Sequence, residues 1–161
     1  MKLGIVDLDT GNLASLLSAL NKLNINFKIC KNSFDFEDVD KIILPGVGAF
    51  KDLMKKINET NMDKIILAKI DKNVSILGVC VGFQILFSGS NEHGDCKGLG
   101  LIKGNFINFK DESEKIKVPH VGWNECKILK KNKLFQDIED NSDFYFTHSY
   151  YLKNYNIENV I

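Results

Sequence analysis

Short apolar runs alternate with amphipathic segments along the first half of the chain, and the two periods predict different elements. Leu3–Asp7 is an apolar run of the kind that forms a buried strand. Leucines from Leu13 to Leu23 then recur at helical spacing and predict a helix over about residues 12–23. Phe27–Cys30 and Lys41–Leu44 predict the next two strands. Strands that alternate with helices in this way are typical of a doubly wound parallel sheet.

The middle of the chain continues this rhythm. Phe50–Asn58 and Met62–Lys72 predict two helices, or one helix that is broken by the polar residues between them. Val74–Leu77 predicts another buried strand, and the apolar run that ends at Phe87 has helical character. Residues 88–98 are rich in Ser, Gly and Asn, and we expect a loop there.

The last third of the chain has weaker patterns. Gly100–Phe109 and Asp143–Tyr151 predict strands. Val118–Asn124 reads as a loop that carries the only Trp, and an aromatic residue beside Pro and Gly is often an interface anchor. The alternative is that Trp123 fills the core. Residues 134–135, Leu and Phe, predict a hydrophobic plug at a helix start.

The most informative motif is Gly78-Val79-Cys80-Val81-Gly82, which joins a predicted strand to a predicted helix. This is the pattern of a nucleophile elbow, with Cys in place of Ser. The glycines allow a sharp turn where a Cβ would clash, and unpaired N–H groups at the helix start favour a thiolate. The N–H of Val81 would form one half of an oxyanion hole. The alternative is a cysteine that only packs in the core.

A second turn, Pro45-Gly46-Val47-Gly48, also follows a strand and precedes a helix. Two glycines at that place let the backbone approach a ligand or turn an N–H group toward it. The alternative is an ordinary strand-to-helix loop. His148 is on its own evidence expected to be a core histidine.

Composition narrows the class of protein. A chain of 161 residues with 44% hydrophobic and 26% charged residues fits one soluble domain, residues 1–161. No apolar run reaches the ~20 residues of a membrane span, and the first residues do not resemble a signal peptide. The four cysteines are scattered, so we expect thiols and a cytoplasmic location.

Charge argues against nucleic acid as a partner. The 21 basic and 21 acidic residues balance, and every basic residue is Lys. Without Arg the chain has no bidentate clamp for a carboxylate or phosphate, so backbone N–H groups, hydroxyls or Lys would bind one. We expect no metal and no cofactor, and no membrane partner.

Four segments together resemble one family in order and spacing. They are residues 45–48, the elbow through Gln84, the segment Pro119-His120-Val121-Gly122-Trp123-Asn124, and Tyr145–Tyr150. The chain resembles the class I, or triad-type, glutamine amidotransferases, and within them the HisH branch of glutaminase subunits. This resemblance implies a three-layer α/β/α fold, flavodoxin-like, with a central, mostly parallel doubly wound sheet and an antiparallel extension.

The resemblance also implies a reaction and the residues that perform it. L-Glutamine would be hydrolysed to glutamate and ammonia through a thioester on Cys80, and the ammonia would pass to a (βα)₈-barrel cyclase of the HisF type in histidine biosynthesis. The oxyanion would be held by N–H groups of Val81 and of the Val47–Gly48 stretch. The positions that match a glutamine-binding wall are Gly46, Gly48, Gln84, His148, Ser149 and Tyr150. The positions that match the barrel-facing surface are Asn12, His120, Val121, Gly122, Trp123 and Tyr145.

One departure from the family pattern is serious. The family has its catalytic His and Glu in a late His-Pro-Glu segment, and no such segment occurs in these 161 residues. A final strand–helix unit, on the order of 30 residues, is therefore expected to be absent. We expect little or no glutaminase activity from the chain as written, and an exposed sheet edge where that strand would lie.

Three other functions fit part of the sequence. A related glutaminase subunit could serve the amidination of a surface sugar. A catalytically silent subunit could dock on the barrel through Trp123 and regulate it. A different cysteine hydrolase on the same sheet would need His120 or His148 within reach of Cys80 as its base.

Overall fold

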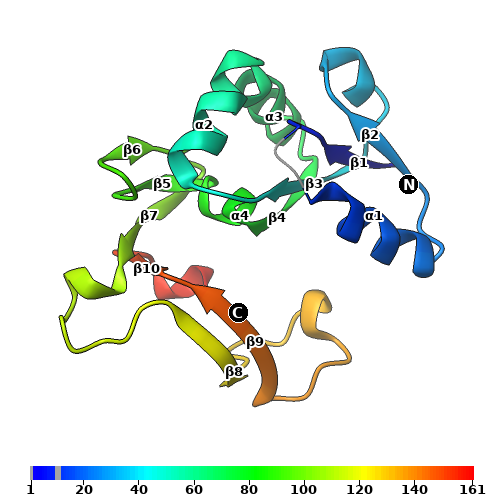
Figure 1. Ribbon diagram of the computed structural model, residues 1–161. Helices are drawn as coiled ribbons and strands as arrows, with labels where there is room; N and C mark the ends of the chain where they lie inside the picture. Colours follow the sequence, from blue (N-terminus) through cyan, green and yellow to red (C-terminus); the bar gives the residue numbers. More distant parts are fainter. Residues whose placement is uncertain (1, 10–11) are drawn as a thin grey trace.

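The first half of the chain forms a parallel four-stranded sheet in a computed structural model that describes residues 2–9 and 12–161 (Figure 1). The strand order is β2-β1-β3-β4. The strands are β1 (Leu3–Val6), β2 (Phe27–Cys30), β3 (Lys41–Gly46) and β4 (Ser75–Cys80). Parallel strands end at the same edge of a sheet, and the register places Gly46 opposite Cys80 at that edge.

Helices cover both faces of this sheet, because side chains that alternate along each strand are buried on both sides. On one face, Ile5 and Ile43 pack with Leu20 of α1 (Leu13–Lys22). On the other face, Ile42 and Leu44 belong to the larger core with buried side chains of α2 (Phe50–Glu59) and α3 (Met62–Ile70). The three-layer α/β/α fold that the resemblance implies is confirmed.

The second half of the chain forms a mixed sheet and a hairpin. The mixed sheet has the order β10-β7-β5-β6, and its strands are β5 (Phe87–Ser90), β6 (Cys96–Lys97), β7 (Ile102–Asn108) and β10 (Tyr150–Lys153). In this sheet β5 and β7 are parallel, and the other pairs are antiparallel. The hairpin consists of β8 (His120–Cys126) and β9 (Ser142–His148) and lies below the parallel sheet in Figure 1.

Several predictions for this half were wrong, because strand pairing overrides local composition. The helix after the elbow is the single turn α4 (Val81–Gln84), and Phe87 lies in β5. The expected loop over residues 88–98 contains the end of β5 and all of β6, and most of the expected loop over residues 118–124 is strand β8. The strand expected over residues 143–151 is divided at Ser149 between β9 and β10.

Short 3₁₀ helices lie between or after the longer elements. They are η1 (Ser33–Phe36), η2 (Phe109–Asp111), η3 (Lys133–Phe135) and η4 (Ile157–Asn159). The hydrophobic plug expected at residues 134–135 is wrong for Leu134, which is 60% exposed in η3. None of the helices in the described parts of the chain combines the length and apolar character that a bilayer span requires.

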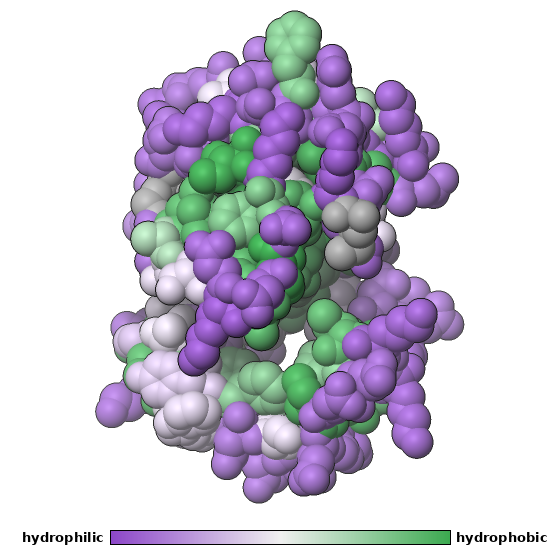
Figure 2. Space-filling model, turned by 90° about the vertical axis from the view of Figure 1, so that its right-hand side faces the viewer, coloured by the Kyte–Doolittle hydropathy of each residue, from purple (hydrophilic) through white to green (hydrophobic). Residues whose placement is uncertain are grey.

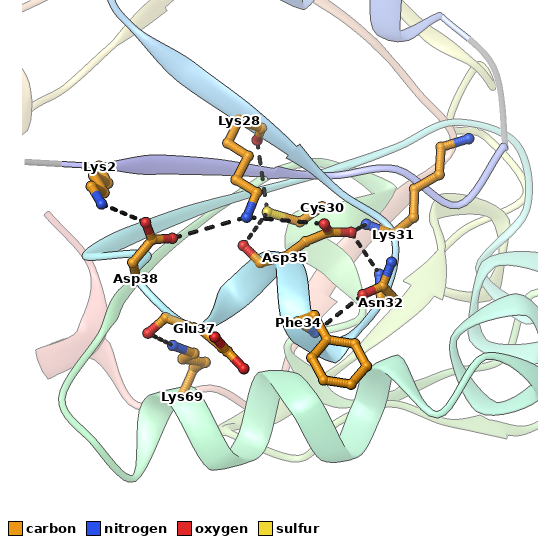
Figure 3. Close-up of polar contacts among 10 residues, drawn as sticks. All are labelled: Lys2, Lys28, Cys30, Lys31, Asn32, Phe34, Asp35, Glu37, Asp38 and Lys69. Atoms are coloured by element: carbon orange, nitrogen blue, oxygen red, sulfur yellow. Dashed lines mark hydrogen bonds and ion pairs between the residues drawn. The ribbon is translucent and has the colours of Figure 1, made fainter.

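Side-chain hydrogen bonds to backbone N–H groups fix the turn from β2, an edge strand of the parallel sheet, into η1 (Figure 3). One carboxylate oxygen of Asp35 accepts hydrogen bonds from the N–H groups of Lys31 (2.9 Å) and Asn32 (3.1 Å), and these bonds lower the pKa of Asp35. The Cys30 thiol lies 3.6 Å from the carbonyl oxygen of Asp35, and burial raises its pKa to about 11. Cys30 is therefore a packing residue that stays protonated at neutral pH.

Two phenylalanines of η1 provide a matched test of this packing. Phe36 is fully buried in the larger core, whereas Phe34 is 76% exposed. We expect Phe36→Ala to lower the free energy of unfolding by about 3–5 kcal/mol, because it removes buried surface and leaves a cavity. Phe34→Ala should change it by no more than about 0.5 kcal/mol. Urea denaturation of both variants checks this, and equal losses would contradict the burial described here.

Candidate active site at the elbow

Cys80 stands at the end of β4, where the chain turns into α4, and it is exposed. Its backbone dihedrals are φ 57° and ψ −122°, a conformation that L-residues rarely adopt. Such strain costs about 1–3 kcal/mol and persists only where the surrounding structure enforces it. The reading of this cysteine as core packing is therefore wrong, and the strained, exposed elbow is present.

Glycines around Cys80 enforce the turn by allowing close backbone contacts. A Cβ on Gly82 would lie 1.9 Å from the carbonyl oxygen of Leu44, and one on Gly78 would lie 2.4 Å from the Cα atom of Phe83. A Cβ on Gly46 would lie 2.5 Å from the Gly82 nitrogen. Real Cβ atoms essentially never approach backbone so closely, so the expectation that a side chain here would clash is confirmed.

The turn at residues 45–48 comes to the same sheet edge as Cys80. Gly46 is the register partner of Cys80 across β3 and β4. Val47 is 38% exposed, and Gly48 has φ +90°, which favours glycine. Val81 is buried and opens α4, whose first N–H groups have no intrahelical partner. The two segments that were expected to supply an oxyanion hole therefore lie at the sheet edge where Cys80 stands, although α4 is too short to have a large dipole.

The thiol of Cys80 makes no hydrogen bond within the described residues, and the two candidate bases are engaged elsewhere. His120 Nδ1 lies 2.8 Å from His148 Nε2, and His148 Nδ1 lies 2.8 Å from the carbonyl oxygen of Tyr150. Both rings are half-buried in the hairpin. The structure therefore brings the histidines to each other and does not bring either of them into hydrogen-bonding contact with Cys80.

The segment Ser149–Tyr150 joins β9 to β10. The carbonyl of Ser149 accepts a hydrogen bond from the Phe109 N–H (3.1 Å), and Tyr150 packs against the larger core. Phe109 also contacts the His148 ring, with centroids 5.2 Å apart. Asn124, whose Oδ1 lies 2.8 Å from His120 Nε2, completes this network. Because residues 118–124 were expected to form a loop, the contact between His120 and Asn124 was not predicted from the sequence.

Residues of the expected docking surface gather on the outer face of the hairpin. Trp123 and Tyr145 are register partners with ring centroids 5.5 Å apart, and they are 69% and 55% exposed. Val121 lies on the same face and is 53% exposed. The alternative that Trp123 fills the core is therefore wrong. Asn12 lies apart from this face, at the start of α1, where its Oδ1 accepts a hydrogen bond from Ser15 (2.9 Å).

Apolar side chains are also exposed next to the elbow. Within the described chain β4 is an edge strand, and its residues Leu77 and Val79 are 44% and 40% exposed, as is Phe83 of α4 at 42%. Figure 2, which looks onto the side where α1 lies, shows hydrophobic surface gathered midway down the molecule, above an opening between its two parts. No cluster of three or more metal-ligating side chains occurs among the described residues.

Comparisons with known proteins agree on one family. Residues 5–160 match the family model "Glutamine amidotransferase class-I". The chain is 42% identical over 153 residues to "Imidazole glycerol phosphate synthase subunit HisH 1" of Campylobacter jejuni strain 81-176, covering 94% of this chain and 75% of that protein. It is 46% identical over 150 residues to the HisH subunit of Methanocaldococcus jannaschii, covering 93% and 74%. A crystal structure of a glutamine amidotransferase has the same fold, with a TM-score of 0.72 at 15% identity, covering 96% of this chain and 75% of that one.

The strain at Cys80 predicts an unusual stability effect. Cys80→Gly should raise the free energy of unfolding by about 1 kcal/mol relative to Cys80→Ala, because glycine relieves the positive φ and alanine does not. The alanine variant is the control for loss of the thiol. Chemical denaturation of both variants checks the difference, and a glycine variant less stable than the alanine one would contradict an enforced strained backbone.

Proposed function

We propose that this chain, which belongs to the class I glutamine amidotransferase family, is the glutaminase subunit of an imidazole glycerol phosphate synthase. It would hydrolyse the side-chain amide of L-glutamine at Cys80 and deliver the ammonia to a (βα)₈-barrel cyclase of the HisF type, in histidine biosynthesis. A cytoplasmic location fits this role and the four free thiols. The names of the relatives favour this acceptor over a surface sugar.

One observation carries the proposal: an exposed cysteine held at positive φ between a strand end and a helix start, beside a glycine turn. A core thiol needs none of these features, as Cys30 illustrates. An acyl-transfer nucleophile needs all of them, since its sulfur must reach the substrate while backbone N–H groups point at the developing oxyanion.

The reaction would begin when the Cys80 thiolate attacks the amide carbon, forming a C–S bond and a tetrahedral oxyanion. N–H groups of Val81 and of the Val47–Gly48 stretch would stabilise that oxyanion. Collapse of the intermediate breaks the C–N bond, and the leaving nitrogen takes a proton and departs as ammonia. Water then hydrolyses the thioester, which gives glutamate and restores the thiol.

Residues from several elements would line the glutamine-binding site, the surface called here the glutamine wall. Gly46 and Gly48 would allow the substrate to approach the backbone, and Gln84 would contribute from the end of α4. Ser149 and Tyr150, with His148 beside them, would complete the wall from the β9–β10 junction. These assignments rest on the matching positions in the family and on the exposure of Cys80 at the same sheet edge as residues 46–48.

Proton transfer is the step that the 161 residues are expected to catalyse poorly. The attacking thiol must lose a proton and the leaving nitrogen must gain one, and a positioned acid–base group accelerates such steps by about 10²–10⁴-fold. Cys80 has no hydrogen-bonded base within the described residues, and His120 and His148 bond to each other. We therefore propose that this chain by itself turns glutamine over slowly.

The docking face would be the outer side of the β8–β9 hairpin. Large aromatic side chains that are exposed together are frequent anchors of protein interfaces, and Trp123 and Tyr145 form such a pair. The barrel cyclase is the partner that we propose for this face.

A glutamine-directed label tests the nucleophile. A glutamine analogue that carries a diazoketone in place of the amide should alkylate Cys80, and excess L-glutamine should protect it, because both occupy the same wall. Peptide mass spectrometry identifies the labelled residue. Cys126→Ala should leave the labelling unchanged. Labelling that spreads over all thiols, or that glutamine does not reduce, would refute the proposed site.

The rate of glutamine turnover tests whether the 161 residues supply an acid–base group for Cys80. With the barrel cyclase present, glutamate release by the 161-residue chain should be at least about 100-fold slower than release by the Campylobacter relative. A coupled glutamate assay measures both rates. A comparable rate that disappears in Cys80→Ala would show that a base does reach the thiol.

Docking can be tested on the aromatic pair. Trp123→Ala should weaken binding to the barrel cyclase by about 2 kcal/mol or more, because truncation removes a large anchor from the interface. Phe34→Ala is the control, since Phe34 is 76% exposed against 69% for Trp123 but lies on η1, next to β2 of the parallel sheet and outside the hairpin. Isothermal titration calorimetry measures both affinities. Equal binding by the two variants would place the cyclase elsewhere on the surface.

A further inference from the structure

A continuous chain of hydrogen bonds crosses the inner face of the β8–β9 hairpin. It runs from the carbonyl of Tyr150 to His148, from His148 to His120, and from His120 to Asn124, with 2.8 Å at each step. His120 and His148 are register partners, so their rings meet on the same face of the two strands. This face is the half-buried one, opposite Trp123.

Donor and acceptor chemistry fixes the protons in this chain. A carbonyl oxygen only accepts, so His148 must carry its proton on Nδ1, and its Nε2 is then an acceptor when the ring is neutral. His120 must donate to that Nε2 from Nδ1. The Nδ1–H tautomer of His148 is therefore supported at both nitrogens, by the Tyr150 carbonyl that accepts from Nδ1 and by the hydrogen bond that Nε2 receives from His120.

The rings are also held in place by aromatic packing. Phe146 stacks on His120 with centroids 5.1 Å apart, and Phe109 meets His148 edge-on at 5.2 Å. Phe109 in turn donates its N–H to the carbonyl of Ser149. The carbonyls of two consecutive residues, Ser149 and Tyr150, thus have their hydrogen-bond donors in Phe109 and His148.

From these contacts we infer that His120 is a positioning residue for the glutamine wall. Its hydrogen bond to Nε2 reinforces the Nδ1–H tautomer of His148, which the Tyr150 carbonyl also favours, and His148 then holds the backbone carbonyl of Tyr150 in place. The same ring is fixed from the other side by Asn124, next to Trp123 on the strand that we propose for docking. This row of hydrogen bonds therefore connects β8, the strand proposed for docking, to Tyr150 in the proposed glutamine-binding site. The inference rests on the proposed function, which assigns those two roles.

The contact with Asn124 depends on which hydrogen atoms the His120 ring carries. Asn124 presents Oδ1 to His120 Nε2, so an imidazolium form of His120 makes both of its hydrogen bonds, whereas a neutral form needs the amide of Asn124 turned by about 180°.

Two substitutions of His120 separate its hydrogen bond to His148 from its hydrogen bond to Asn124. The amide nitrogen of His120→Asn falls near the position of Nδ1 and keeps a donor toward His148. The amide of His120→Gln falls near the position of Nε2, so it keeps the contact with Asn124 and loses the donor toward His148. His93→Asn is the matched control, because His93 is exposed, lies outside this chain of bonds and has a positive φ that asparagine tolerates.

The first readout is independent of activity. Long-range ¹H–¹⁵N correlation spectra of the histidine rings should show neutral His148 as the Nδ1–H tautomer in the parent protein, in His120→Asn and in His93→Asn. In His120→Gln only the Tyr150 carbonyl is left to favour Nδ1–H, so a fraction of the Nε2–H tautomer should appear beside it. An Nε2–H tautomer in the parent protein, or identical spectra for the Asn and Gln variants, would overturn the inference.

The second readout is L-glutamine binding, measured by calorimetry in a Cys80→Ala background. His120→Gln should weaken binding about tenfold, the size expected for a lost hydrogen bond that positions the wall, and His120→Asn less than about threefold. Equal weakening by both would overturn the positioning role. If glutamine binds to none of the proteins, including the parent, the proposed function fails, and the tautomer measurement alone decides this inference.

Discussion

The contact on which the site depends is the approach of the α4 backbone to β3. A Cβ at Gly82 would lie 1.9 Å from the Leu44 carbonyl oxygen, so only glycine lets the first turn of α4 lie against the strand. That approach bends the chain sharply after β4 and forces Cys80 into positive φ. It also brings the elbow beside Gly46, so one backbone contact places the thiol and the neighbouring N–H groups together. Strain at Cys80 is maintained by this packing and by the parallel pairing of β3 and β4.

The remaining architecture supports that contact from two sides. The larger core, which includes Leu44, Leu53 and Val81, fixes β3, α2 and the start of α4 relative to one another. The mixed sheet is attached to the same core through Phe87 and Phe106, whose rings lie 5.4 Å apart. The hairpin has less support, since no residue of β8 or β9 is fully buried, and histidines and aromatic rings, not aliphatic side chains, pack on its inner face.

The difference in packing between the parallel sheet and the hairpin matches the proposed chemistry. The proposed nucleophile, Cys80, lies at the end of a strand in the parallel sheet, where a small displacement would lower the rate, and the aromatic pair proposed for docking lies on the hairpin. The paired histidines lie between the two, with one end on the Tyr150 carbonyl and the other on Asn124. A partner that contacts Trp123 would therefore be joined to the substrate wall through hydrogen bonds and not only through the backbone.

The amino-acid sequence by itself determined the parallel sheet, its covering helices and the elbow, because these depend on local period and on glycine spacing. Phe27–Cys30 was located to the residue, and Gly78-Val79-Cys80-Val81-Gly82 indicated the sharp turn that exposes Cys80. Only the tertiary structure decided that Phe87 lies in a strand, since its partner Ile102 is distant in the chain. The pairing of His120 with His148 and the exposure of Trp123 were decided in the same way. Strand register sets which side chains meet and which face solvent, and register is a property of two segments together.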